Sequence, residues 1–100
     1  MKLLNSLFLG FVKLHILHHA SQEPVYGLWL IEELEEHGYR LSPGTLYPIL
    51  HSLEVGKLLK VESRVVDGKV RKYYSLTATG KSALAEGKAK AQELISEINE

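Results

Sequence analysis

Three amphipathic patterns in the first half of the chain predict three helices. The first, over about residues 3–20, is apolar on nearly all sides, which is typical of a helix buried on more than one side. Pro24 separates it from the second, over about residues 26–37, because proline lacks an N–H donor and restricts the residue before it. The second has one apolar side and one glutamate-rich side, and Gly38 follows it as a left-handed C-cap.

The third pattern combines an apolar stripe with an uncharged opposite side. Four apolar residues fall at i, i+3, i+4 and i+7: Leu46, Ile49, Leu50 and Leu53. Ser42 is expected at the N-cap and Pro43 at the first helical position. Because Pro48 lies inside the pattern, we expect a distorted first turn over residues 42–45 and regular helix to about residue 54. The uncharged side suits a surface of mixed donors and acceptors such as a DNA groove, although an ordinary amphipathic helix would show the same stripe.

After Gly56 the pattern changes from helical to β type. Runs over residues 58–66 and 69–76 flank Asp67-Gly68, a two-residue turn of the kind that needs positive φ, so we expect a hairpin. Thr77 is the expected N-cap of a last helix that ends near residue 98. The order of elements, with the third helix just before a basic hairpin, predicts a mainly α fold with a β-hairpin: a winged helix-turn-helix over residues 1–76, followed by a C-terminal dimerisation helix over residues 77–100.

The last helix carries a short heptad seam that no remaining element is expected to cover. Its members recur at spacings of three and four: Leu84, Gly87, Ala91, Leu94 and Ile98. We expect the seam to meet a second copy of the chain, together with one side of the first helix. The expected interface residues are Leu4, Phe8, Leu84, Ala91, Leu94, Ile95 and Ile98. Packing of the seam on the first helix of the same chain is the alternative.

Composition narrows the function. One hundred residues support one domain, and the absence of cysteine excludes disulfides and thiolate chemistry and suits a cytosolic protein. The net charge is zero, but seven Lys or Arg lie between Lys57 and Lys81, where the acids are Glu62 and Asp67 alone. This sidedness favours a polyanionic partner. An enzyme is not expected, because the sequence has no cysteine, no glycine-rich phosphate loop and no paired carboxylate set with a base nearby. The apolar N-terminal run is too polar at its end for a signal peptide or a membrane span.

The histidines of the first helix allow two interpretations. His15, His18 and His19 stand at i, i+3 and i+4, a spacing that can place imidazoles on one metal ion. Packing at the helix end and pairing with its C-terminal dipole explain them without a metal, so no metal or other cofactor is assigned. Trp29 is interpreted as a core residue rather than as a ligand platform.

Several motifs together resemble the PadR family of bacterial transcriptional regulators. They are Tyr26-Gly27-Leu28, Leu34-Glu35 with Gly38-Tyr39, Leu41-Ser42-Pro43-Gly44-Thr45-Leu46-Tyr47-Pro48, Leu53-Glu54 with Gly56, and Arg71-Lys72-Tyr73-Tyr74-Ser75-Leu76-Thr77 with Gly80. The likeness covers about residues 7–84. Tyr26 departs from the family, which usually has His before the glycine of the second helix. The single C-terminal helix resembles the short subfamily.

The resemblance implies a homodimeric repressor that binds a pseudo-palindromic DNA operator, with a small-molecule effector between the subunits in some members. On this hypothesis the third helix enters the major groove and the hairpin contacts phosphates or a neighbouring minor groove. The expected DNA-binding residues are Ser42, Gly44, Thr45, Tyr47, Pro48, His51, Arg64, Lys69, Arg71 and Lys72. Tyr74 is expected in the core. Two alternatives stay open: a winged-helix protein-interaction module without DNA binding, and a metal-sensing regulator that uses the three histidines.

Overall fold

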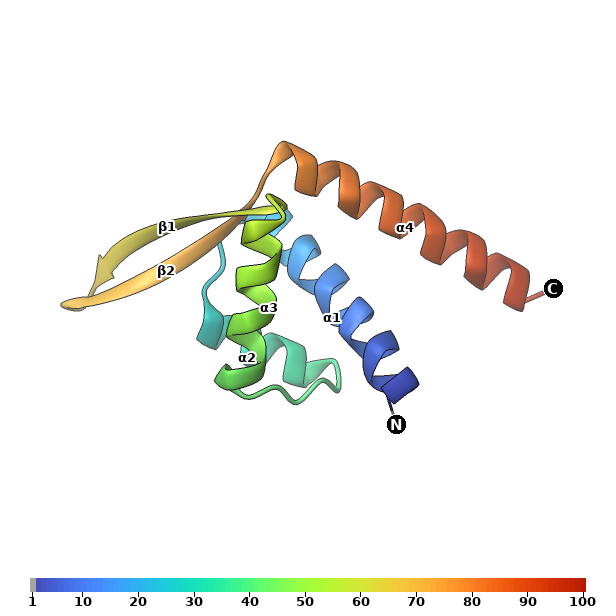
Figure 1. Cartoon of the computed structure of the whole chain (residues 1–100), viewed down its shortest axis with the longest axis horizontal. Coiled ribbons are helices and arrows are strands. Elements are labelled where there is room, and N and C mark those ends of the chain that lie inside the picture. The colour runs from blue at the N-terminus through green and yellow to red at the C-terminus, as the bar shows by residue number, and fades with distance from the viewer. Residues whose placement is uncertain (1) are drawn as a thin grey trace.

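Four helices and one hairpin make up the part of the chain that the structure describes. The computed structural model describes the backbone of residues 2–100 and the side chains of residues 5–100. The elements are α1 (Lys2–Gln22), α2 (Gly27–Glu36), α3 (Pro43–Val55), β1 (Leu59–Val66), β2 (Lys69–Leu76) and α4 (Ala78–Ile98). The hairpin projects to one side of the three-helix core and α4 to the other (Figure 1). The predicted winged helix-turn-helix with one further helix is therefore confirmed.

The core lies between α1, α2, α3 and the base of the hairpin. The predicted stripe of α3 is buried, since Leu46 and Leu50 are fully covered and Ile49 and Leu53 are nearly so. They pack with Ile16 and other apolar residues into one cluster. Each such side chain contributes about 1.5–3 kcal/mol when buried. The stripe therefore fixes which side of α3 faces the core, and so which side is left for a partner.

The turn between α2 and α3 is a Schellman motif. Gly38 has a φ of +90°, as expected for a left-handed C-cap residue. The Tyr39 N–H donates to the Leu34 carbonyl at 2.9 Å, and the Gly38 N–H donates to the Glu35 carbonyl at 3.0 Å. These two bonds satisfy carbonyls that the helix end would otherwise leave unpaired. The turn thereby sets the angle at which the chain enters α3.

The expected distorted first turn of α3 is wrong, because an unbroken α-helix begins at Pro43. The main departure in this turn is a shared acceptor: the Ser42 carbonyl receives the N–H groups of both Thr45 and Leu46, at 3.0 and 2.9 Å. Because Pro48 has no N–H, the helix lacks only the backbone hydrogen bond that residue 48 would have donated to the Gly44 carbonyl. Gly44 is exposed, so a water molecule can donate to its carbonyl instead.

The hairpin and its turn match the prediction. Asp67 and Gly68 both have positive φ, 50° and 76°, as a two-residue turn of this type requires. The register pairs Val66 with Lys69 at the tip and Leu59 with Leu76 at the base. Val25, between α1 and α2, adds an antiparallel bridge to Tyr74 through bonds of 2.9 and 2.7 Å. This bridge was not predicted, and it fastens the start of α2 to the wing.

Thr77 joins the wing to α4. Its side chain accepts from the Gly80 N–H at 2.9 Å, which confirms the predicted N-cap. Its hydroxyl also lies 2.6 Å from the Lys57 carbonyl, and its N–H donates to the Leu58 carbonyl at 3.1 Å. A β-carbon at the buried Gly80 would lie 2.2 Å from that Leu58 carbonyl oxygen. The start of α4 is therefore held against the end of α3 at a distance that only glycine allows.

Beyond this joint, α4 packs on α1 for only part of its length. A β-carbon at Gly87 would meet the Leu14 side chain at 2.6 Å, so the two helices touch closely there. Further along, α1 and α4 diverge toward the two chain ends (Figure 1). Packing within one chain, the alternative considered above, thus accounts for the first half of the seam. The second half remains exposed.

Candidate nucleic-acid interface

The side of α3 opposite the core is exposed along its whole length. All six residues predicted there are exposed: Ser42, Gly44, Thr45, Tyr47, Pro48 and His51. The Ser42 hydroxyl points to the Thr45 hydroxyl at 3.3 Å rather than capping a backbone N–H. The Gly44 N–H belongs to the first turn, whose amides have no acceptor within the helix. These groups present hydrogen-bonding atoms at the end of α3 that carries the positive helix dipole.

Tyr47 is placed differently from the other five residues. Its hydroxyl packs on the first residue of α2, where a β-carbon at Gly27 would lie 2.4 Å from the Tyr47 oxygen. The side chain is still 46% exposed. Tyr47 therefore lies along the boundary between α3 and the start of α2, rather than pointing straight out from α3.

Two arginines of the wing are held by tyrosine rings. The Arg71 guanidinium carbon lies 4.0 Å from the centre of the Tyr26 ring, and Arg64 lies 4.4 Å from the centre of the Tyr73 ring. Arg71 also donates to the Tyr73 hydroxyl at 3.4 Å, and this hydrogen bond raises the pKa of Arg71. Cation–π contacts of this kind favour one side-chain position over the many that a free arginine samples. The two charges are thus presented in fixed places.

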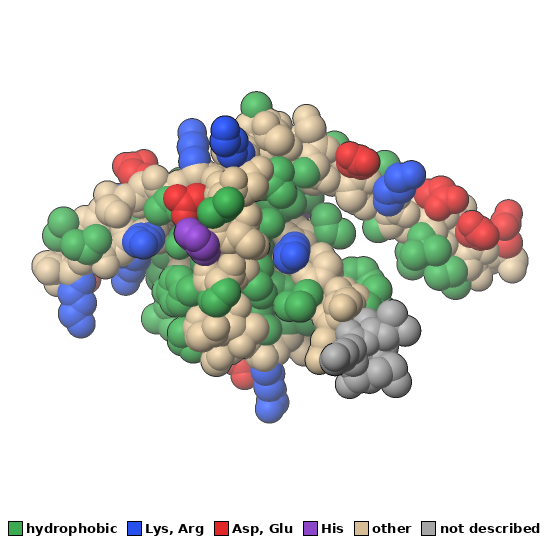
Figure 2. Space-filling model, viewed as in Figure 1, with side chains coloured by type: hydrophobic (Ala, Val, Ile, Leu, Met, Phe, Trp, Pro, Cys, Tyr) green, Lys and Arg blue, Asp and Glu red, His purple; other side chains and the backbone are tan. Residues whose placement is uncertain are grey.

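The basic residues of the wing divide between its two faces. Arg64 pairs directly with Arg71 in the ladder, and alternation places Lys69 on the same face. Lys72 lies on the other face with Tyr74, which is 4% exposed and therefore belongs to the core as predicted. Basic side chains accordingly project from more than one edge of the wing (Figure 2).

A cleft of about 640 Å³ joins the wing to the helices. Its walls come from the start of α2, from Tyr47 of α3 and from the wing: Tyr26, Gly27, Leu28, Tyr47, Val66, Asp67, Lys69, Val70, Arg71 and Lys72. The structure therefore brings four of the predicted residues, one from α3 and three from the wing, to one cleft. Sequence reasoning missed Tyr26 and Gly27 as parts of this cleft. The motif Tyr26-Gly27-Leu28 was the signal that could have identified both.

The residues predicted for the dimer interface lie on the other side of the molecule from the wing. Apolar side chains line the edge of α4 that faces α1, and charged side chains line its opposite edge (Figure 2). Leu94, Ile95 and Ile98 are 53–66% exposed, and Phe8 of α1 is 48% exposed. Leu84 and Ala91 are half-buried within the single chain. The Leu4 side chain lies outside the described residues.

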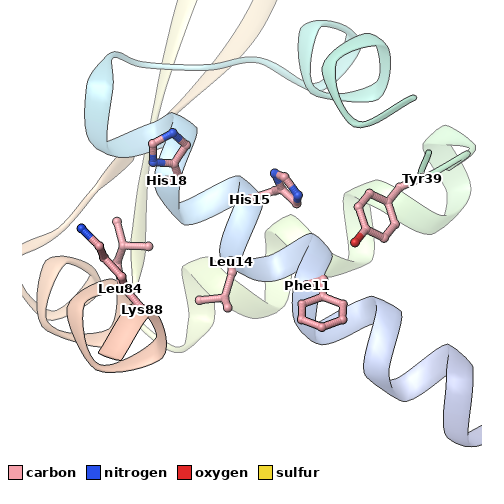
Figure 3. Close-up of a pocket in the computed structure, with 7 residues that line it drawn as sticks. All are labelled: Phe11, Leu14, His15, His18, Tyr39, Leu84 and Lys88. Carbon is pink, nitrogen blue, oxygen red and sulfur yellow. The ribbon is translucent and has the colours of Figure 1, made fainter. Parts of the chain in front are cut away.

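The histidine prediction requires a correction. His15 and His19 face His37, at the end of α2, while His18 is exposed and is not part of that group. His18 instead borders a pocket of about 420 Å³ between α1 and the first half of α4 (Figure 3). Trp29 is partly buried against the core, as interpreted from the sequence.

The fold and the exposed α3 beside a basic wing define a winged helix-turn-helix protein. Residues 16–86 match the Transcriptional regulator PadR-like family. The chain belongs to this family and is a transcriptional regulator, not an enzyme. It is 54% identical over 87 residues to Transcriptional regulator Rv3488 of Mycobacterium tuberculosis, a match that covers 87% of this chain and 81% of that protein.

Solved structures show the same relationship. A PadR-like transcription factor from Bacteroides fragilis superposes with a TM-score of 0.85 at 33% identity, covering 99% of this chain and 97% of the other. A PadR-like transcriptional regulator from Bacillus cereus superposes with a TM-score of 0.80 at 31% identity, covering 99% of this chain and 94% of the other. Among residues 2–100, no helix is long and apolar enough to cross a membrane.

Proposed function

We propose that the protein is a homodimeric, sequence-specific DNA-binding repressor that responds to a ligand. The observation that carries the proposal is the exposed side of α3, which Tyr47 joins to the start of α2 and to the wing through one cleft. That surface combines an uncharged, hydrogen-bonding helix with arginines and lysines on a neighbouring hairpin. A helix in the major groove and a basic wing on the backbone need this combination.

The two parts of the surface have different roles in this proposal. Thr45 and His51 face the bases, and the amides around Gly44 receive a phosphate at the helix N-terminus. Tyr47, packed on Gly27, contributes its exposed ring edge at the boundary of the groove. Arg64, Lys69, Arg71 and Lys72 supply the sequence-independent, salt-sensitive part of the affinity. Pro48 and Ser42 shape the end of α3 that approaches the DNA backbone.

The exposed apolar residues of α1 and α4 support the dimer. Leu94, Ile95 and Ile98 lie on one side of α4 by their helical spacing, and all three are exposed in the single chain. The C-terminal half of α4, which carries them, runs beside the N-terminal half of α1 (Figure 1). Two copies joined through these faces place two α3 helices on one side of a duplex. Half-sites about 34 Å apart, one turn of DNA, then give a pseudo-palindromic operator. On this proposal residues 1–76 bind DNA and residues 77–100 form the dimerisation helix, which is the reason for dividing the chain after residue 76.

The pocket between α1 and α4 supports ligand response. Leu14 points toward the α4 residues Leu84 and Lys88, while Phe11 and Tyr39 close the side nearer α2 (Figure 3). A small molecule with an apolar body and one anionic group fits this lining, because Lys88 is its only fully charged side chain. Such a ligand would alter how α4 packs on α1 and hence the spacing of the two α3 helices.

The wing assignment is tested by the salt dependence of DNA affinity. In the variant Arg71→Ala/Lys72→Ala we expect weaker binding to every sequence and a salt slope smaller by about 1–2 units, because each phosphate contact contributes about 0.9. Fluorescence anisotropy with labelled promoter DNA at several salt concentrations measures both. Lys90→Ala removes a positive charge from α4 outside the pocket between α1 and α4 and should leave the affinity and the salt slope unchanged. A salt slope of the double variant equal to that of Lys90→Ala would contradict the assignment.

A protein-interaction module is the second candidate, favoured by the zero net charge and by the exposed glutamates of α2. It predicts no DNA shift even at low salt, together with a stable protein partner. The salt titration therefore separates the two candidates, since only the DNA-binding protein gives a slope to measure.

A further inference from the structure

Three of the five histidines of the chain converge from two different helices. His15 and His19 lie one turn apart on α1, and His37 follows the last residue of α2. The nitrogen atoms that each could offer to a ligand all lie within 4.8 Å of one another. The rings of His15 and His37 are stacked, with their centres 4.7 Å apart. Nothing in the proposed DNA-binding surface uses this cluster.

Glu33 borders the same space from α2. Its carboxylate oxygen lies 3.3 Å from Nε2 of His37 and 3.6 Å from Nε2 of His19. The second distance is too long for a hydrogen bond. Nε2 of His19 is accordingly buried with no hydrogen-bond partner, and it faces Glu33 in the middle of the cluster. A buried polar atom without a partner is unusual and calls for an explanation.

We propose that His15, His19 and His37 bind one divalent transition-metal ion, with the Glu33 carboxylate as fourth ligand or as the group that orients a histidine. Zn²⁺ in a tetrahedral site holds its nitrogen ligands about 3.3 Å apart, given bonds of about 2.0–2.1 Å. The present nitrogen positions therefore need only side-chain movements, which the 44% exposed His37 permits. Three imidazoles with a carboxylate favour Zn²⁺, Ni²⁺, Co²⁺ or Cu²⁺ over Mg²⁺ and Ca²⁺, which prefer oxygen ligands.

An ion at this position would link α1 to the end of α2. Helix α1 carries part of the proposed dimer surface, and α2 leads through the Gly38 turn directly into α3. Metal occupancy would thus fix the position of the helix-turn-helix relative to the dimer surface. A consequence for operator affinity rests on the proposed function, whereas binding of the ion itself does not. The test is therefore made without DNA.

Isothermal titration of Zn²⁺ into the tag-free, metal-free chain tests the site. We expect one ion per chain and a raised midpoint temperature of unfolding. His15→Ala and His37→Ala should each weaken Zn²⁺ binding at least about tenfold, and Glu33→Gln by about 10–100-fold. His18→Ala and His51→Ala are matched controls, because both residues are exposed histidines outside the cluster, and they should bind as the wild type does.

Trp29 provides a second readout at the same place. It is the only tryptophan, and its ring lies 5.3 Å from that of His19. Binding of Cu²⁺ or Co²⁺ should quench its fluorescence. His37→Ala should abolish the quenching at the same ion concentration, and circular dichroism checks that this variant, altered at an exposed position, keeps its fold. Absence of Zn²⁺ binding to the wild type would overturn the proposal. So would an equal loss of affinity in His18→Ala or His51→Ala and in His37→Ala.

Discussion

At the scale of single residues, glycines allow the closest contacts of this fold. Gly27 accommodates the Tyr47 hydroxyl, Gly80 the Leu58 carbonyl and Gly87 the Leu14 side chain. Gly44, in contrast, has only the Ser42 hydroxyl near its missing β-carbon, at 3.8 Å. The same residue type therefore serves packing at three positions and leaves open space at the fourth.

Gly80→Ala should destabilise the protein by about 1–3 kcal/mol, because the new methyl group would overlap the Leu58 carbonyl oxygen and push α4 from the end of α3. Urea unfolding followed by circular dichroism measures the change. Gly44→Ala is the control for the substitution itself. Equal stabilities of the two variants would show that the contact at Gly80 relaxes without cost.

Because the hydroxyl of Tyr74 is buried, we expect the protein to lose stability at alkaline pH. Burial raises the pKa of its hydroxyl, and Glu54 and Tyr47 raise it further. A group whose pKa is higher in the folded state contributes stability that is present below the unfolded pKa, about 10, and is lost as the pH rises through the folded value. The free energy of unfolding should therefore fall above pH 10, and less steeply in Tyr74→Phe. Parallel pH profiles of the two proteins would contradict this account.

At the scale of elements, the sequence predicted what local patterns determine. The stripe of α3, the Asp67-Gly68 turn and the Thr77 cap each follow from a short run of residues. The unpredicted features depend on contacts between distant segments. The Val25 bridge, the stacking of Arg71 on Tyr26 and the approach of His37 to His15 join residues more than 20 positions apart.

The candidate site was predictable to the same extent. Exposure of the α3 residues followed from the helical period, and the positive charge of the wing followed from composition. The position of the Tyr47 hydroxyl on Gly27 did not, because it depends on the crossing of α2 and α3. The prediction of a distorted first turn in α3 was wrong because Pro48 was treated as a proline deep inside a helix, where water could not replace the lost hydrogen bond. Pro48 lies in the second turn of α3.

Gly44→Ala should separate stability from DNA binding within α3. Alanine is the better helix former, so the free energy of unfolding should stay the same or rise by up to about 1 kcal/mol. The added methyl group would stand between the first-turn backbone and DNA, so operator affinity should fall. Anisotropy with promoter DNA beside urea unfolding measures both quantities. An unchanged affinity would show that DNA does not approach the backbone here.

At the scale of the whole molecule, two surfaces lie at opposite ends of a chain that measures 54 × 31 × 22 Å. The wing and α3 face one side, and the diverging ends of α1 and α4 face the other (Figure 1). A regulator that reads a two-fold DNA site needs one surface for DNA and another for its partner copy. The proposed metal cluster and the pocket beside Leu84 both lie between them.

Leu94→Lys/Ile98→Lys should convert the protein to a monomer, because two charges would enter the proposed apolar interface. Sedimentation velocity at micromolar concentration measures the change in mass. Ala89→Lys adds a charge to the exposed side of α4 away from the seam and should leave the dimer intact. A wild-type protein that already sediments as a monomer would contradict the dimer.

The most direct test of the proposed function is hydroxyl-radical footprinting of the DNA upstream of the gene for this protein. A homodimer with α3 in the major groove and the wing on the backbone should protect two symmetric segments centred about 34 Å apart, one turn of the duplex. Arg71→Ala should weaken both protections together. Absence of any protection at low salt, or a single protected segment with no symmetric counterpart, would contradict the proposal.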